Sequence, residues 1–186
     1  TERLERELPG YRLVQRSRED AFGIALLSRL PMSHGQVIYP AGGQLPAIEA
    51  VIEAHGQRVA VLAIHPPPPV TAELSAERDR VIAAAADWSR APASGAGAVD
   101  HAVVVGDMNA TPWSWPMRRL VRDSELIDSL RGHGVQTSWP SQLIPLSIPI
   151  DHVLHSPSLT AVERSVGPFM GSDHRPVHVA LAPVAN

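Results

Sequence analysis

The stretch AVVVGDMNATPWSW, residues 102–115, decides how this sequence is interpreted. An apolar run ends at a glycine, and Asp107, Asn109, Trp113 and Trp115 follow closely. A short apolar run bounded by turn residues is typical of a buried strand. Asp and Asn beyond a strand favour turns, because their side chains bond nearby backbone groups. The same residue types at a strand end also carry catalysis, so the remaining sequence must decide between the two interpretations.

Strands and helices on both sides of this stretch predict an α/β or α+β fold, with a layered sandwich favoured. Thr71 is a good N-cap for a helix at residues 73–90, whose apolar residues recur at helical spacing. Shorter helices are predicted at residues 2–8 and 114–121. Strands are predicted at residues 11–15, 22–28, 35–39, 47–55, 57–65, 101–106, 148–156, 159–166 and 176–183.

Composition limits the classes of function. The chain has 186 residues, 44% of them hydrophobic and 19% charged, which predicts one globular domain over residues 1–186. The net charge is −3 and every basic residue is arginine, so lysine chemistry and a broad attraction to nucleic acid are excluded. There is no cysteine and no apolar run near the roughly 20 residues that span a bilayer.

Four motifs each place a polar residue at the end of an apolar strand. Any one of them alone is explained by a turn or by chance, but four such ends on one sheet edge indicate a site. The motifs and their residues are AIHP with His65, GDMN with Asp107 and Asn109, PIDHVL with Asp151 and His152, and GSDHRP with Ser172, Asp173 and His174.

Together with ALLSRLPM, these motifs resemble the endonuclease/exonuclease/phosphatase family, the DNase-I-like phosphoesterases, over residues 25–177. The resemblance implies a four-layer α/β/β/α sandwich and hydrolysis of a phosphoester by water attack on phosphorus, assisted by a divalent metal. The early strands of that fold lie ahead of its first helix. Since the helix predicted at residues 2–8 of this chain corresponds to that first helix, we expect a catalytic domain truncated at its N-terminus.

The resemblance also implies roles for the motif residues. Asp107 would position or deprotonate the attacking water, and Asn109 would hold that water and a phosphate oxygen. His65 would donate to the phosphoryl oxygens. Asp151 would orient His174, which would stabilise the transition state or transfer a proton.

The implied cofactor is Mg²⁺ or Mn²⁺, because phosphoryl transfer needs a hard cation with oxygen ligands. Asp173 would lie at the metal or beside its ligands. The family's main glutamate ligand is expected upstream of Thr1, since the glutamates of residues 2–7 fall in a predicted helix rather than at a strand end.

Details such as GDMNATPWSWPMRRL and GPFMGSDHRP are most similar to a bacterial branch with transmembrane helices ahead of the catalytic domain. That branch includes a glycopeptide-resistance protein associated with hydrolysis of lipid pyrophosphates. The resemblance implies a domain that is itself soluble, in a membrane-anchored protein, with the extracytoplasmic side favoured. Trp113 and Trp115 would then meet substrate or bilayer, and Arg29 would contact phosphate. The alternative for both tryptophans is packing beside the following helix.

The substrate stays open among phosphodiester, phosphomonoester and lipid pyrophosphate, and no protein partner is predicted. DNA or RNA is a less favoured alternative, because the chain is acidic. A noncatalytic domain that binds a phospholigand or lipid is the other alternative. Calcineurin-like phosphoesterases, serine hydrolases and zinc proteases are disfavoured because their sequence elements are absent.

Overall fold

The computed structural model describes residues 6–93 and 95–184. Its largest element is a six-stranded sheet in the order β3-β4-β5-β6-β8-β7. Neighbouring strands run antiparallel except β5 and β6, which are parallel. The strands are β3 (Met32–Ile38), β4 (Ala47–Ala54), β5 (Gln57–Ala63), β6 (His101–Asp107), β7 (Ile127–Asp128) and β8 (Asp151–His155).

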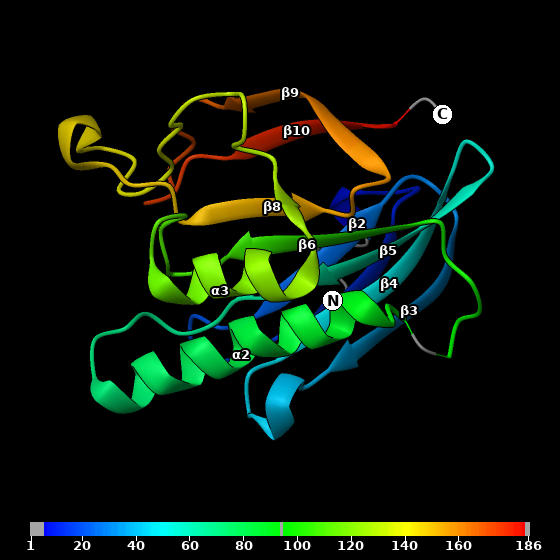
Figure 1. Cartoon of the computed structure of the whole chain (residues 1–186), viewed down its shortest axis with the longest axis horizontal. Helices are drawn as coiled ribbons and strands as arrows, with labels where there is room; N and C mark the ends of the chain where they lie inside the picture. The colour runs from blue at the N-terminus through cyan, green and yellow to red at the C-terminus, as the bar shows by residue number, and fades with distance from the viewer. Residues whose placement is uncertain (1–5, 94, 185–186) are drawn as a thin grey trace.

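Two helices cover one face of this sheet (Figure 1). Helix α2 (Ala72–Arg90) is the crossover that makes β5 and β6 parallel, and α3 (Trp115–Ser124) lies against it. The predicted cap is confirmed, since the hydroxyl of Thr71 accepts the N–H of Leu74 at 3.2 Å. Leu62, Ile64, Val104 and Leu154 from the sheet pack against α2 and α3 in the main hydrophobic core.

The other face of the sheet carries a second β layer made of two separate antiparallel pairs. One pair is β1 (Arg12–Arg16) with β2 (Ile24–Ser28), and the other is β9 (Leu159–Val166) with β10 (Val177–Pro183). Val14, Ile24 and Leu26 of the first pair pack against Ile48 and other residues of this face in a second core.

The α/β class with a helix-covered central sheet is therefore confirmed, and the described residues form three of the four predicted layers. The predicted opening helix falls largely on residues 1–5, which lie outside the described residues. Two short 3₁₀ turns complete the structure, η1 (Pro40–Gly42) and η2 (Ile144–Leu146).

Most predicted strands are found, with different ends. Strand β3 begins at Met32, three residues earlier than predicted, and α3 ends at Ser124, three residues later. The predicted strand at residues 148–156 begins only at Asp151. Strand β7 was not predicted.

Candidate active site

The predicted polar residues meet at one edge of the central sheet. Because β5 and β6 are parallel, their carboxyl ends place His65 and Asp107 side by side at this edge. Strand β8 runs antiparallel to β6, so its first residue, Asp151, lies at the same edge and pairs directly with Asp107. Paired residues on neighbouring strands point to the same face of a sheet, so the two carboxylates lie together.

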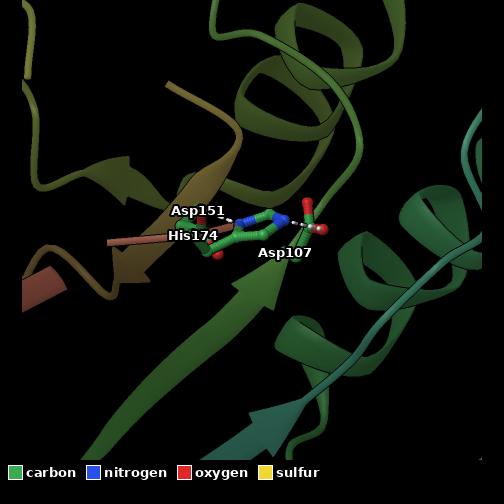
Figure 2. A group of neighbouring side chains, drawn as sticks. All are labelled: Asp107, Asp151 and His174. Carbon is green, nitrogen blue, oxygen red and sulfur yellow. Dashed lines mark hydrogen bonds and ion pairs between the residues drawn. The ribbon is translucent and has the colours of Figure 1, made fainter. Parts of the chain in front are cut away.

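The loop between β9 and β10 contributes His174. Its Nδ1 lies 2.8 Å from Oδ2 of Asp151, which fixes the ring with Nδ1–H directed at that carboxylate. The other ring nitrogen, Nε2, lies 3.7 Å from Oδ2 of Asp107 (Figure 2). His65 approaches the same oxygen from the other strand, with Nε2 at 3.6 Å. Asp107 therefore stands between two imidazoles, with one of its oxygens facing both.

The loop after β6 is held in a defined conformation. The backbone N–H of Asn109 donates to Oδ1 of Asp107 at 2.8 Å, and its side-chain amide donates to the carbonyl of Pro66 at 3.0 Å. Asn109 has φ +46°, a left-handed conformation that Asn tolerates better than most residues. The turn chemistry expected of GDMN is thus present, and it fixes the strand-end carboxylate.

Burial shifts the protonation of these groups. Burial raises the pKa of Asp107, and the charge of Asp151 adds to it, against the opposing effects of the Asn109 amide and the two imidazoles. The hydrogen bond to Asp151 raises the pKa of His174. Burial is the largest single effect on Asp151 and acts to raise its pKa, but the hydrogen bonds from His174 and Ser138 and the charges of His174 and His152 together outweigh it, so this pKa lies below its usual value. Asp151 and His174 thus form a hydrogen-bonded carboxylate–imidazole pair beside a carboxyl with an increased affinity for protons.

A cleft of about 780 Å³ opens over these groups. Its charged floor contains His65, Asp107, Asp151, Asp173 and His174, and Asn109 also lines it. Its walls are mainly apolar and are formed by Ala21, Phe22, Pro68, Pro69, Val70, Trp139, Ile148 and Ile150. No arginine of the described residues lines this cleft. Arg175 lines a second hollow of about 470 Å³ on the other side of Asp107 and His174.

The donor set fits a divalent cation. Asp107, Asp151 and His174 each offer a ligand atom, and these atoms lie within 4.8 Å of one another. Two adjacent carboxylates suit hard cations such as Mg²⁺ and Mn²⁺, whose charge would offset the burial and the repulsion from Asp151 that raise the pKa of Asp107. Asp173 is outside this group of three, and the indole N–H of Trp139 points at its carboxylate with Nε1 and Oδ2 3.4 Å apart.

The three residues expected to bind substrate lie outside the cleft. The guanidinium of Arg29 stacks over the ring of Tyr11 at 4.9 Å and is not among the lining residues. Trp113 borders a neighbouring hollow with Arg131 and Val135. Trp115 borders a groove between α2 and α3, with Arg119 stacked over its ring at 5.2 Å. Both tryptophans are more than half exposed, so neither is packed in the core beside the following helix.

A buried pair behind the site was not foreseen. His152 is 2% exposed, with Nδ1 2.8 Å from Oδ2 of Asp128 and Nε2 donating to the carbonyl of Ala110 at 2.9 Å. This pair ties β7 and β8 to the loop after Asn109. Buried Arg164 donates to the carbonyl of Asp151 at 3.2 Å. The sequence could have indicated this arrangement, because Asp151 and His152 are neighbours in a predicted strand. Successive side chains of a strand point to opposite faces, so the two residues cannot both face the cleft.

Comparison with known proteins agrees with this geometry. The family model described as the endonuclease/exonuclease/phosphatase family matches residues 2–174. The chain belongs to this family. Its members are phosphoesterases and nucleases, and they typically use divalent metals, for which a candidate acidic and histidine cluster exists here. No curated protein matches the chain.

Solved structures of the family share the fold at low sequence identity. A humanised TDP2 of D. rerio has a TM-score of 0.74 at 14% identity, over 97% of this chain and 80% of that one. The 3′ phosphatase NExo from Neisseria, bound to a product DNA hairpin, has a TM-score of 0.71 at 19% identity, over 95% and 81%. The mannosyl-6-phosphatase from Bacteroides thetaiotaomicron has a TM-score of 0.68 at 18% identity, over 97% and 80%.

Proposed function

We propose that this domain hydrolyses a phosphoester whose organic part is apolar, with a divalent metal as cofactor. The observation that carries the proposal is the cleft itself, in which a charged floor of Asp107, Asp151 and His174 lies under apolar walls without arginine. A nucleic acid substrate requires cationic side chains along its backbone path. An apolar alcohol or lipid part needs only the apolar contacts that Phe22 and Trp139 offer.

In the proposed reaction, Asp107 accepts a proton from water as the water oxygen attacks phosphorus, and the bond from phosphorus to the leaving oxygen breaks. The raised pKa of Asp107 suits its role as proton acceptor. The Nε2 atoms of His65 and His174 lie near the same carboxylate oxygen at distances too long for hydrogen bonds, so each can donate to a phosphoryl oxygen. A bound divalent cation would supply charge stabilisation for those oxygens.

We further propose that the substrate is a lipid pyrophosphate and that the domain belongs to a membrane-anchored protein of the bacterial branch that works on the extracytoplasmic side. The main glutamate ligand of the metal would lie upstream of Thr1. The roles of the site residues, with Asp173 at or beside the metal and Arg29, Trp113 and Trp115 at the substrate, are proposals too.

The test is a hydrolysis assay on the natural protein that contains this sequence, with Mg²⁺ or Mn²⁺ and with EDTA. The substrates are bis(p-nitrophenyl) phosphate, a polyprenyl pyrophosphate and single-stranded DNA. We expect metal-dependent hydrolysis of the first two to exceed that of DNA. Asp107→Asn should lower the rate by about 10²–10⁴-fold without loss of folding, because it removes the proton acceptor. Asp87→Asn, on the exposed surface of α2, is the matched control.

Two results contradict the proposal. Preferred cleavage of DNA would identify the protein as a nuclease. A folded protein that binds Mn²⁺ but hydrolyses none of the substrates would support the noncatalytic binding domain instead.

A further inference from the structure

Large apolar side chains are exposed around the mouth of the cleft. The four most exposed of the large hydrophobic residues described are Val70, Met170, Leu146 and Val135, each more than 70% exposed. Val70 lines the cleft, Met170 lines the second hollow beside Asp107, and Val135 lines the hollow that contains Trp113. The most exposed apolar side chains are therefore concentrated at the edge of the sheet that carries the site, although others such as Val162 are exposed elsewhere, and apolar patches of this kind mark interaction sites.

The loop before β8 presents the largest part of this surface. Its two ends, Trp139 and Ile148, pair across an isolated β-bridge and both line the cleft. The turn between them holds Leu143, Ile144 and Leu146, which are 57%, 59% and 72% exposed. In Figure 1 this yellow loop projects from the body of the domain.

This loop is ordered by its own hydrogen bonds rather than by burial of its apolar side chains. Ile148 N donates to the carbonyl of Trp139 at 2.6 Å, and Ser147 Oγ donates to the carbonyl of Pro140 at 2.6 Å. The fold thus holds three aliphatic side chains in water at a fixed place, which costs free energy unless a partner covers them.

Four segments of the loops at this edge contain no charged residue, although Asp173, His174 and Arg175 follow one of them. Residues 66–71, 108–117, 134–150 and 165–172 include no Asp, Glu, Lys or Arg. A polyanion would require cations here, and a protein interface usually has a polar, partly charged rim. An uncharged aliphatic surface that carries tryptophans is instead typical of segments that enter the interfacial region of a bilayer.

Positive charge begins behind this uncharged surface. Helix α3 starts at Trp115 and carries three arginines against one aspartate, and Arg131 lies beside Trp113 in the same hollow. The order from aliphatic tip to tryptophan to arginine matches the order from acyl chains to anionic headgroups in a membrane. This charge complementarity favours a lipid surface over an apolar protein as the partner.

We propose that this apolar rim docks the domain on a lipid bilayer that contains anionic headgroups. The rim consists of Val70, Trp113, Val135, Leu143, Ile144, Leu146, Phe169 and Met170. Docked in this way, the mouth of the cleft meets the bilayer surface. The inference deepens the proposed function, because it names the surface at which an apolar phosphoester would be met, but the docking itself does not require hydrolysis.

The test is binding of the domain to vesicles of phosphatidylcholine alone and of phosphatidylcholine with an equal part of phosphatidylglycerol, measured by sedimentation. Three of the four tryptophans, Trp113, Trp115 and Trp139, lie at this edge, so brominated lipids should quench most of the fluorescence. We expect stronger binding to the anionic vesicles. The triple variant Leu143→Ser, Ile144→Ser, Leu146→Ser should weaken binding by about tenfold or more, because it removes apolar area from the tip.

The control is the double variant Leu30→Ser, Val162→Ser, which changes exposed apolar residues away from the rim and should bind like the wild type. Absence of binding to both vesicles would overturn the inference, as would binding that the triple variant leaves unchanged. A dimer in sedimentation velocity that the triple variant dissociates, without vesicle binding, would show that a second copy covers the rim instead. Hydrolysis of bis(p-nitrophenyl) phosphate by the triple variant, measured in parallel, separates a failure of docking from a failure of the proposed function.

Discussion

Gly106, the residue before the candidate catalytic Asp107, should be among the least replaceable residues of the domain. Its φ is +146°, and a Cβ built on it would lie 1.9 Å from the carbonyl oxygen of Ile64. That atom belongs to the backbone, so a side chain cannot move aside to make room. Ile64 N also donates to the carbonyl of Val105 at 3.0 Å. An alanine at position 106 must therefore separate β5 from β6 where His65 and Asp107 face each other.

The expected cost follows from these two effects. Backbone conformations reserved for glycine cost an alanine about 1–3 kcal/mol, and loss of the hydrogen bond between the strands adds about 1 kcal/mol. We expect Gly106→Ala to destabilise the domain by about 2–4 kcal/mol. For a domain of this size, that lowers the melting temperature by roughly 5–15 °C.

Gly56, in the turn that opens β5, is the matched control. Its φ is +78°, and nothing lies within 4 Å of the site of a Cβ, so Gly56→Ala should cost only the left-handed strain of about 1 kcal/mol. Melting of both variants by circular dichroism, with Mg²⁺ present and absent, makes the comparison. If Gly106→Ala melts within about 2 °C of Gly56→Ala, the contact with Ile64 does not constrain the edge and the reasoning is refuted.

Two further predictions concern helix α2 and the buried pair. Thr71→Ala should lower the free energy of unfolding by about 1 kcal/mol in urea melts, since it removes the cap on the N–H of Leu74; Thr71→Ser should restore it, and an equal loss in both would exclude capping. Burial is the largest single effect on Asp128 and acts to raise its pKa, but the hydrogen bond and charge of His152, the N–H of Leu130 and the charge of Arg164 together lower it. A lowered folded-state pKa contributes stability that is present above the unfolded value near 4 and is lost as the pH falls through the folded value. The difference in melting temperature between wild type and Asp128→Asn should shrink as the pH falls below about 4; a difference at pH 2 as large as that at pH 5 would contradict this.

The parts of the fold that local sequence patterns specify were predicted. The cap of α2 and the apolar runs of β5 and β6 have clear periodicity and clear ends. Strand β3 was partly missed because it is at the edge of the sheet and half of its residues are solvated, so its apolar signal is weak. Strand β7 has only two residues, and it is defined by pairing with β8 rather than by its own composition.

In the candidate site too, the residues that a local sequence pattern specifies were predicted, and those that depend on distant contacts were not. His65, Asp107, Asn109, Asp151, Asp173 and His174 line one cleft, as the strand-end motifs predicted. The sequence did not indicate Phe22 and Trp139 on its walls, because loop positions depend on contacts far apart in the chain. It also did not separate Asp151 from His152. The alternation of side chains along β8 sends Asp151 to the cleft and His152 to the buried pair with Asp128.

The charges on the floor of the cleft explain why a phosphoester needs more than this cleft to bind. Three carboxylates, those of Asp107, Asp151 and Asp173, line the cleft, and no arginine of the described residues does, so even a protonated His174 would offset their charge only in part. A phosphate group is repelled by such a floor, and the repulsion is strong because the groups are largely buried. A bound divalent cation would offset this negative charge. In the proposed function the metal would therefore act first in substrate binding and then in the chemical step, while the apolar walls and rim would select the organic part without contributing charge.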